Sequence, residues 1–235
     1  MTDEAQVRTA APISLVRRHA GRVAAELAII ISGILIALAA DALLERRAER
    51  VREVELLRLL AADLSESAAL LREDSRFAAT RSDTLSWYRN LYGQAEESLP
   101  TDRVRDVLMS ANVTASYAPI LRAYEALIAT GSLDLIRDDS MLFAIADVNR
   151  TTQEYLDYRD QTTNVWLFTL MPIWLEHAGA QNAADLSAAL ESTQFRGALG
   201  QRTVFLRNTA RRGNELAARM EQLAERISAA LPVEP

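Results

Sequence analysis

The chain has 235 residues and a formal net charge of −6, and all 26 of its basic residues are arginine. Acidic and basic side chains are interleaved, which argues against a basic face for nucleic acid, and the absence of cysteine excludes disulfides, thiolate metal sites and cysteine nucleophiles. Glycine and proline are few, with eight and six residues, and alternating β-branched runs are rare, so an all-α fold is predicted.

A strongly apolar block, residues 23–44, follows an arginine-containing N-terminal tail, residues 1–22. The block supplies 22 residues, and a helix needs about 20 mostly apolar residues to cross a bilayer. We therefore predict a single-pass transmembrane helix in the inner (cytoplasmic) membrane of a bacterium, with the lipid bilayer as a partner. Arginine counts on the two sides are nearly equal, and the short preceding tail favours an extracytoplasmic position for residues 45–235.

Two carboxylates leave room for other interpretations of this block. Glu26 and Asp41 restrict the uncharged run to residues 27–40, which is 14 residues. A run of that length is also typical of a buried core helix or of a signal-peptide core. The A-x-A-like site at residues 40–42 fits a cleaved signal, although no glycine or proline breaks the helix just before it.

One face of the predicted span carries small and polar residues at spacings of four and three. These residues are Glu26, Ile30, Gly33, Ala37 and Ala40. A small-xxx-small pair lets a second helix approach closely, so this stripe predicts association with another copy of the chain or with a membrane-protein partner. Because alanine is abundant throughout the sequence, chance is the competing explanation.

The same helix is predicted to continue past residue 44 into a heptad-like seam, with Gly93 as the first good stop. The seam is formed by Val54, Leu57, Ala61, Leu64, Ala68 and Leu71. Residues 45–235 then read as one antiparallel helical bundle, because amphipathic segments alternate with short loops.

Further helices are predicted from start and stop signals along the chain. The predicted elements are a short helix from Thr101 or Asp102, a helix from Pro119 to before Gly131, a long helix capped by Asp138 or Asp139, a core segment 165–175 kinked by Pro172, a short helix capped by Asn182 and Asp185, and a last helix over 193–231. Segment 165–175 is too short to span a bilayer, and contact with a membrane surface or a partner competes with the core interpretation.

Two segments resemble a family of uncharacterised bacterial proteins that have one N-terminal membrane span and a helical domain. Residues 25–27 and 32–38 match the family's Gly-Glu-(apolar) and Gly-Ile-Leu-Ile-Ala-Leu span, whereas residues 39–44 depart from its Asn-Asn-Trp-Asn segment. The second motif, Tyr-Glu-x-Leu-x-x-x-Gly, is reproduced by Tyr124, Glu125, Leu127, Gly131, Leu133 and Ile136. The resemblance implies a membrane-anchored helical protein and implies no activity; physically, the motif predicts a corner between two helices, with a ligand-binding corner as the alternative.

The sequence offers no catalytic, cofactor-binding or metal-binding residues. The only histidines, His19 and His177, lack metal-site spacing, and phosphate loops and nucleophile elbows are absent. We therefore expect no enzyme, but a membrane-anchored interaction or scaffold protein, oligomeric or accessory to a bacterial membrane assembly. The alternatives are a sensory or ligand-binding helical domain that signals through a partner, and a pore-forming or toxin-like protein assembled around Glu26.

Overall fold

The computed structural model describes residues 13–90, 106–107, 109–111, 119, 122–177, 188–189 and 191–232. Every regular element in these ranges is a helix, which confirms the all-α prediction. The chain divides into two compact units, Met1–Arg52 and Glu53–Pro235, called unit one and unit two below. The predicted stop at Gly93 and the predicted helix starts at residues 101–102 and 182–185 lie outside the described residues, whereas the described residues 106–107, 109–111 and 188–189 of the two predicted short helices are helical.

The first element is α1 (Ile13–Asn90), a helix of 78 residues that supplies the described part of unit one and the first helix of unit two. Alanine, leucine, arginine and glutamate dominate it, and these are the residues with the best helix propensity. Its only internal glycines are Gly21 and Gly33, and no proline interrupts it. The helix therefore runs through the predicted span and seam without a break.

A tight corner joins α3 (Arg122–Ala129) to α4 (Asp139–Val165) and contains the 3₁₀ turn η1 (Ser132–Leu135). Gly131 takes the left-handed conformation, with φ of 65°, which ends α3 as its sequence predicts. Asp138 caps α4, because its carboxylate accepts from the backbone N–H groups of Ser140 and Met141.

A π-helical turn, η2 (Trp166–Leu170), joins α4 to α5 (Met171–His177). Proline at 172 has no N–H to give to the carbonyl four residues back, and the preceding N–H of Met171 bonds to the carbonyl of Trp166, five residues back. The predicted Pro172 kink is thus taken up as a π turn. Trp166 and Trp174 are buried, as the core interpretation of this segment requires.

The last helix, α7 (Thr193–Ala230), begins where Ser192 accepts a hydrogen bond from the N–H of Phe195. Buried residues recur at spacings of three and four along its whole length, so one face is buried from end to end. Its bounds agree with the predicted helix over 193–231.

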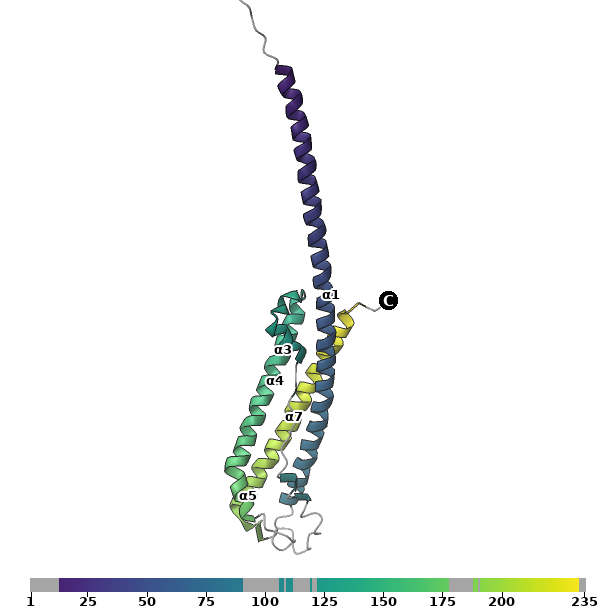
Figure 1. Cartoon of the computed structure of the whole chain (residues 1–235). Helices are drawn as coiled ribbons and strands as arrows, with labels where there is room; N and C mark the ends of the chain where they lie inside the picture. Colours follow the sequence, from purple (N-terminus) through teal and green to yellow (C-terminus); the bar gives the residue numbers. More distant parts are fainter. Residues whose placement is uncertain are drawn as a thin grey trace, which may run out of the picture. The chain divides into compact units, whose positions relative to one another are not determined.

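In unit two, α7 runs antiparallel to both other long helices (Figure 1). Arg72 and Ser82 of α1 bond to Glu221 and to the carbonyl of Thr203, so numbers rise in α1 as they fall in α7. In the same way α4 meets α7 first through Asp147 and Arg219, and further along through Tyr158 and Arg212. It follows that α1 and α4 point in the same direction, and the antiparallel bundle predicted for successive helices is not confirmed.

Among the described residues of unit two, the core consists of two separate apolar clusters. Cluster one is built by residues 57–71 of α1, 141–155 of α4 and 216–227 of α7, together with residues of α3 and the corner. Cluster two is built by residues 78–88 of α1, the η2 and α5 segment and residues 195–210 of α7, together with Val107, Ala111 and Ala189. Trp174 stacks on Phe195 in cluster two, with ring centroids 5.1 Å apart.

Candidate interaction surface

In the described part of unit one, large apolar side chains point to every side of a helix. Ten leucine and isoleucine side chains between residues 27 and 44 are 48–72% exposed. They are Leu27, Ile29, Ile30, Ile31, Ile34, Leu35, Ile36, Leu38, Leu43 and Leu44. Consecutive residues of a helix point about 100° apart, so the run at positions 29–31 and 34–36 covers every side of α1. We call residues 27–44 the apolar segment.

The predicted association stripe begins at Glu26, just before this segment, and continues along it. Its five residues, Glu26, Ile30, Gly33, Ala37 and Ala40, are all exposed. A Cβ added at Gly33 would have nothing within 4 Å, so the surface around it is open. The helix continues the stripe to Leu44 and Arg47, at spacings of four and three. The structure thus leaves the stripe accessible, while its association with another helix stays a prediction.

The predicted seam has a different environment, because its residues are covered by the same chain. Leu57, Ala61, Leu64, Ala68 and Leu71 are buried in cluster one, and Val54 is half-buried. Their neighbours include Ile145 of α4 and Leu216 of α7. A heptad-like pattern predicts a buried face but does not say which helix covers it.

The residues of the Tyr-Glu-x-Leu motif lie at the corner between α3 and α4. Leu127 and Ile136 are buried in cluster one and Tyr124 packs against it, whereas Glu125 is exposed. The corner is held by two carboxylates of α1: Asp63 accepts from the N–H of Ala123 at 2.7 Å, and Glu53 accepts from the N–H of Arg137 at 3.2 Å. These contacts fit the structural interpretation of the motif.

Within the part of the chain that the structure describes, no helix is both long enough and apolar enough to cross a membrane. The predicted transmembrane helix over 23–44, the single-pass inner-membrane location and the extracytoplasmic side assigned to residues 45–235 are therefore corrected. The physical reason lies in Glu26 and Asp41, which leave 14 uncharged residues. Fourteen helical residues rise about 21 Å, less than the roughly 30 Å of a bilayer's hydrocarbon core.

Ion pairs link α7 to α1 and to α4 at the surface of unit two. Arg72 and Glu221 form a two-bond pair, with Nε and Oε1 2.6 Å apart, and this partner lowers the pKa of the Glu221 carboxyl. Asp147 accepts from Arg150 on its own helix and, at 2.8 Å, from Arg219 on α7, and both contacts lower the pKa of Asp147. These residues are 39–60% exposed, so each pair contributes little to stability.

A shallow groove of about 200 Å³ lies beside these pairs between α4 and α7. Its lining is formed by Ala144, Asp147, Val148, Arg219, Gln222, Leu223 and Arg226. Asp147 and Arg219 already bond to each other across it. The lining is therefore mixed, and the two opposite charges at its centre neutralise each other.

One buried charged residue, Arg202, was not identified from the sequence as a candidate functional residue. Arg202 is 4% exposed, donates from Nε to the carbonyl of Ala111 at 3.1 Å and lies over the ring of Trp166 at 4.7 Å. Burial lowers the pKa of its guanidinium to about 10. The sequence does indicate that Arg202 is buried, because Arg202 lies at helical spacing between Leu199 and Leu206 on the buried face.

Among the described residues, no group of three or more histidine, cysteine, aspartate or glutamate side chains is placed to hold a metal ion. Comparisons with protein-family models, with curated proteins and with solved structures find no match to this chain. The family resemblance stated from the sequence therefore stays a prediction. Among the described residues, the apolar segment of α1 holds the longest run of exposed leucine and isoleucine side chains.

Proposed function

We propose that this chain is a helical scaffold protein that assembles with further copies of itself through the apolar segment of α1. The observation that carries the proposal is the exposure of ten large aliphatic side chains on all sides of one helix. Together they present roughly 1,000 Å² of apolar surface, whereas a soluble monomer rarely exposes more than a few hundred Å² in one patch. A helix that is apolar all round is stable in water only when other structure covers it.

The size of the surface fits a protein partner. A stable protein interface buries about 800 Å² on each side, and the apolar segment supplies that area by itself. Since an identical helix presents the same open strip around Gly33 and Ala37, two copies can approach each other closely there.

Charge at the two ends of the stripe favours an antiparallel pair of copies. Glu26 lies at the start of the stripe and Arg47 at its end, and both are exposed. In an antiparallel pair Glu26 of each copy meets Arg47 of the other, whereas a parallel pair places like charges together. A pair covers one face of each helix, so we propose that two such pairs associate into a tetramer that covers the remaining faces.

The proposal assigns a supporting role to unit two. Its three long helices are proposed to form a small bundle that each copy carries into the assembly. Paired charges such as Arg72 with Glu221 keep the outer surface of this bundle polar, and exposed mixed charge keeps an assembly soluble.

Sedimentation equilibrium of the full chain in detergent-free buffer tests the proposal. We expect a mass that is a multiple of the 26.0 kDa monomer at micromolar concentration. The single variants Glu26→Arg and Arg47→Glu should each weaken assembly, and the double variant should restore it. Glu45→Arg, also exposed on α1, reverses a charge outside the stripe and is the matched control.

Two results would contradict the proposal. One is a monomer at all concentrations up to about 50 μM, where an interface of about 800 Å² on each side is expected to hold. The other is a chain that floats with phospholipid vesicles and does not self-associate, which would identify lipid as the cover of the apolar segment. Failure of the charge-reversal pair alone would reject the antiparallel arrangement and leave self-assembly standing.

A further inference from the structure

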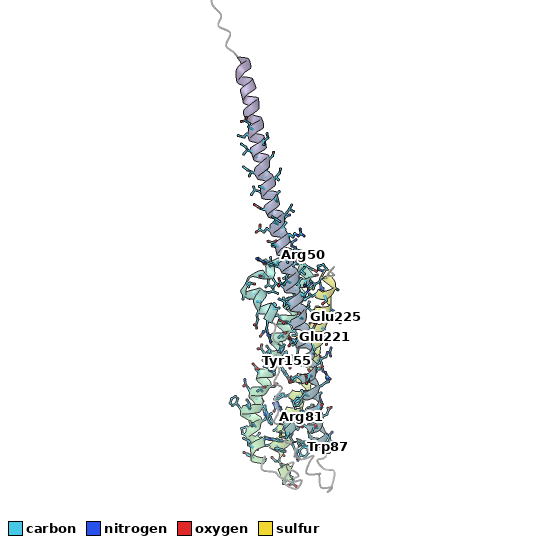
Figure 2. All side chains as sticks on the ribbon, turned by 45° about the vertical axis from the view of Figure 1, so that its right-hand side comes forward. Arg50, Arg81, Trp87, Tyr155, Glu221 and Glu225 are labelled. Carbon is cyan, nitrogen blue, oxygen red and sulfur yellow. The ribbon has the colours of Figure 1, made fainter. Side chains whose placement is uncertain are left out.

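An exposed phenylalanine lies beside the shallow groove between α4 and α7 of unit two. Phe143 of α4 is 76% exposed, and the next residue, Ala144, lines the groove. The α7 wall of the groove comes from residues 219–226, the stretch in which Figure 2 labels Glu221 and Glu225. Glu221 itself bonds to α1, whereas the groove is lined by α4 and α7 alone. The groove and Phe143 therefore form one surface that α1 does not close.

The groove has an apolar floor and a rim of paired charges. Val148 and Leu223, which belong to cluster one, line it and are 5% and 4% exposed. On the rim, Asp147 accepts from Arg150 and from Arg219. Since these charges already have opposite charges beside them, a charged occupant would gain little and would lose its own hydration. The groove therefore favours an uncharged, apolar occupant.

The size of the groove favours one side chain of a protein partner over a small molecule. Its volume is about 200 Å³, below the roughly 300–1,000 Å³ of small-molecule sites. Protein interfaces are commonly anchored by an aromatic side chain that fills a pocket and is surrounded by a polar rim. Phe143 of a second copy is an aromatic side chain of this kind, and it is exposed in the single chain.

We infer that the α4 and α7 faces of two copies pair about a two-fold axis, with Phe143 of each copy in the groove of the other. A two-fold contact uses the same patch on both copies, so the anchor and its groove must be neighbours on one surface. Phe143 and Ala144 meet this condition, because consecutive residues of a helix point about 100° apart. The inference rests on the proposed self-assembly through the apolar segment.

The contact needs that assembly, because it is too small to hold two free copies together. A phenylalanine anchor supplies about 150–250 Å² on each copy, a fraction of the about 800 Å² that a stable interface buries on each side. In a tetramer of two antiparallel pairs, two α1 helices leave each end, and each continues into unit two of its own copy. Such tethering raises the effective concentration of one unit two for another to about the millimolar range, where a weak contact forms.

Photo-crosslinking from position 143 tests the inference in the full chain. Phe143→p-benzoylphenylalanine keeps an aromatic ring, and isotopically labelled and unlabelled copies are mixed at low concentration, concentrated together and irradiated. We expect crosslinks between a labelled and an unlabelled copy, attached within residues 144–148 or 219–226. Phe168 of η2, which is 78% exposed, receives the same probe as the matched control and should give no crosslinks to these segments.

A variant that fills the groove makes the test specific. Ala144→Leu enlarges a side chain of the groove lining and keeps a good helix former. We expect the crosslinks between copies to fall to the level of the control at position 168, with the sedimentation mass unchanged, because unit one is untouched. Ala218→Leu makes the same substitution at an exposed position of α7 that does not line the groove, and it should leave the crosslinks as they are.

The possible results separate this inference from the proposed function. An assembled chain that gives no crosslinks from position 143 to the groove of a second copy would overturn the inference alone, and so would crosslinks that stay within one copy. Undiminished crosslinks in Ala144→Leu would also overturn it. A mass of 26.0 kDa at all concentrations would contradict the proposed function, and the inference would fall with it.

Discussion

The close approach of α7 to α1 at Gly213 makes a prediction whose sign depends on geometry. Replacing glycine by alanine inside a helix ordinarily stabilises it by about 0.5–1 kcal/mol. At Gly213 the added methyl group would overlap Oγ of Ser75, and overpacking a tight core typically costs about 1–3 kcal/mol. We therefore expect Gly213→Ala to destabilise unit two by about 1 kcal/mol, the difference between the two effects.

A second substitution, at Ser75, completes a double-mutant cycle by removing the atom that the added methyl group would overlap. Ser75→Ala deletes the overlapping oxygen and also a buried hydroxyl that bonds to no described residue, so it should stabilise by about 1 kcal/mol. In the double variant the helix-propensity gain is realised as well, for a total near 2 kcal/mol. The single effects sum to about zero, so the coupling energy is near 2 kcal/mol, within the range for residues in contact.

Thermal unfolding followed at 222 nm, at one fixed protein concentration, measures all four chains. A change of 1 kcal/mol corresponds to about 2–4 °C for a chain of this size. Gly213→Ala should melt lower than the unmodified chain, and the double variant should melt higher than Ser75→Ala. If Gly213→Ala melted higher by itself and the two substitutions were additive, α1 and α7 would not approach each other as described.

Three further predictions concern unit two. Glu221→Gln should lower the free energy of unfolding at neutral pH, because Arg72 depresses the pKa of Glu221 in the folded state. This loss is present above the unfolded pKa of about 4.3 and should vanish as the pH falls through the folded pKa. Urea titrations of both chains from pH 7 to pH 2.5 would measure it. Gly131→Ala should cost about 1 kcal/mol, because an L side chain disfavours the left-handed backbone although the space around it is open, and Gly131→Asn should cost less in the same melting assay. Ser192→Ala should cost about 1 kcal/mol by removing the cap of α7, and Ser192→Asp should retain the stability; an equal loss in both would reject the cap.

Much of the helical part of unit two could be predicted, because its signals are local. Gly131 and Asp138 mark a helix end and a helix start within a few residues of where the structure has them. The buried face of α7 follows from spacings of three and four. Such signals depend on backbone sterics and on unsatisfied N–H groups, which a short stretch of sequence determines.

What the sequence could not predict depends on contacts between distant residues. Periodicity identifies a buried face but carries no direction, so the parallel course of α1 and α4 was not foreseen. Pro172 predicted a kink, and the π turn that absorbs it depends on a bond from Met171 to Trp166. The membrane prediction failed because the block was counted through Glu26 and Asp41, whose charges shorten the apolar run.

The apolar segment shows how much of the candidate interaction surface could be predicted from the sequence. Helical spacing alone places its residues and the small-residue stripe on one helix, α1, whereas the predicted association of the stripe stays a prediction. Only the structure shows that these residues are exposed, whereas the seam from Leu57 to Leu71 is covered by the same chain. The two patterns look alike in sequence, since both are apolar residues at spacings of three and four.

The molar mass of the full chain in detergent-free buffer, measured by sedimentation equilibrium, tests the central claim most directly. Self-assembly through the apolar segment predicts a mass that is a multiple of 26.0 kDa, reduced in Glu26→Arg and restored when Arg47→Glu is added. A mass of 26.0 kDa across the micromolar range would contradict it.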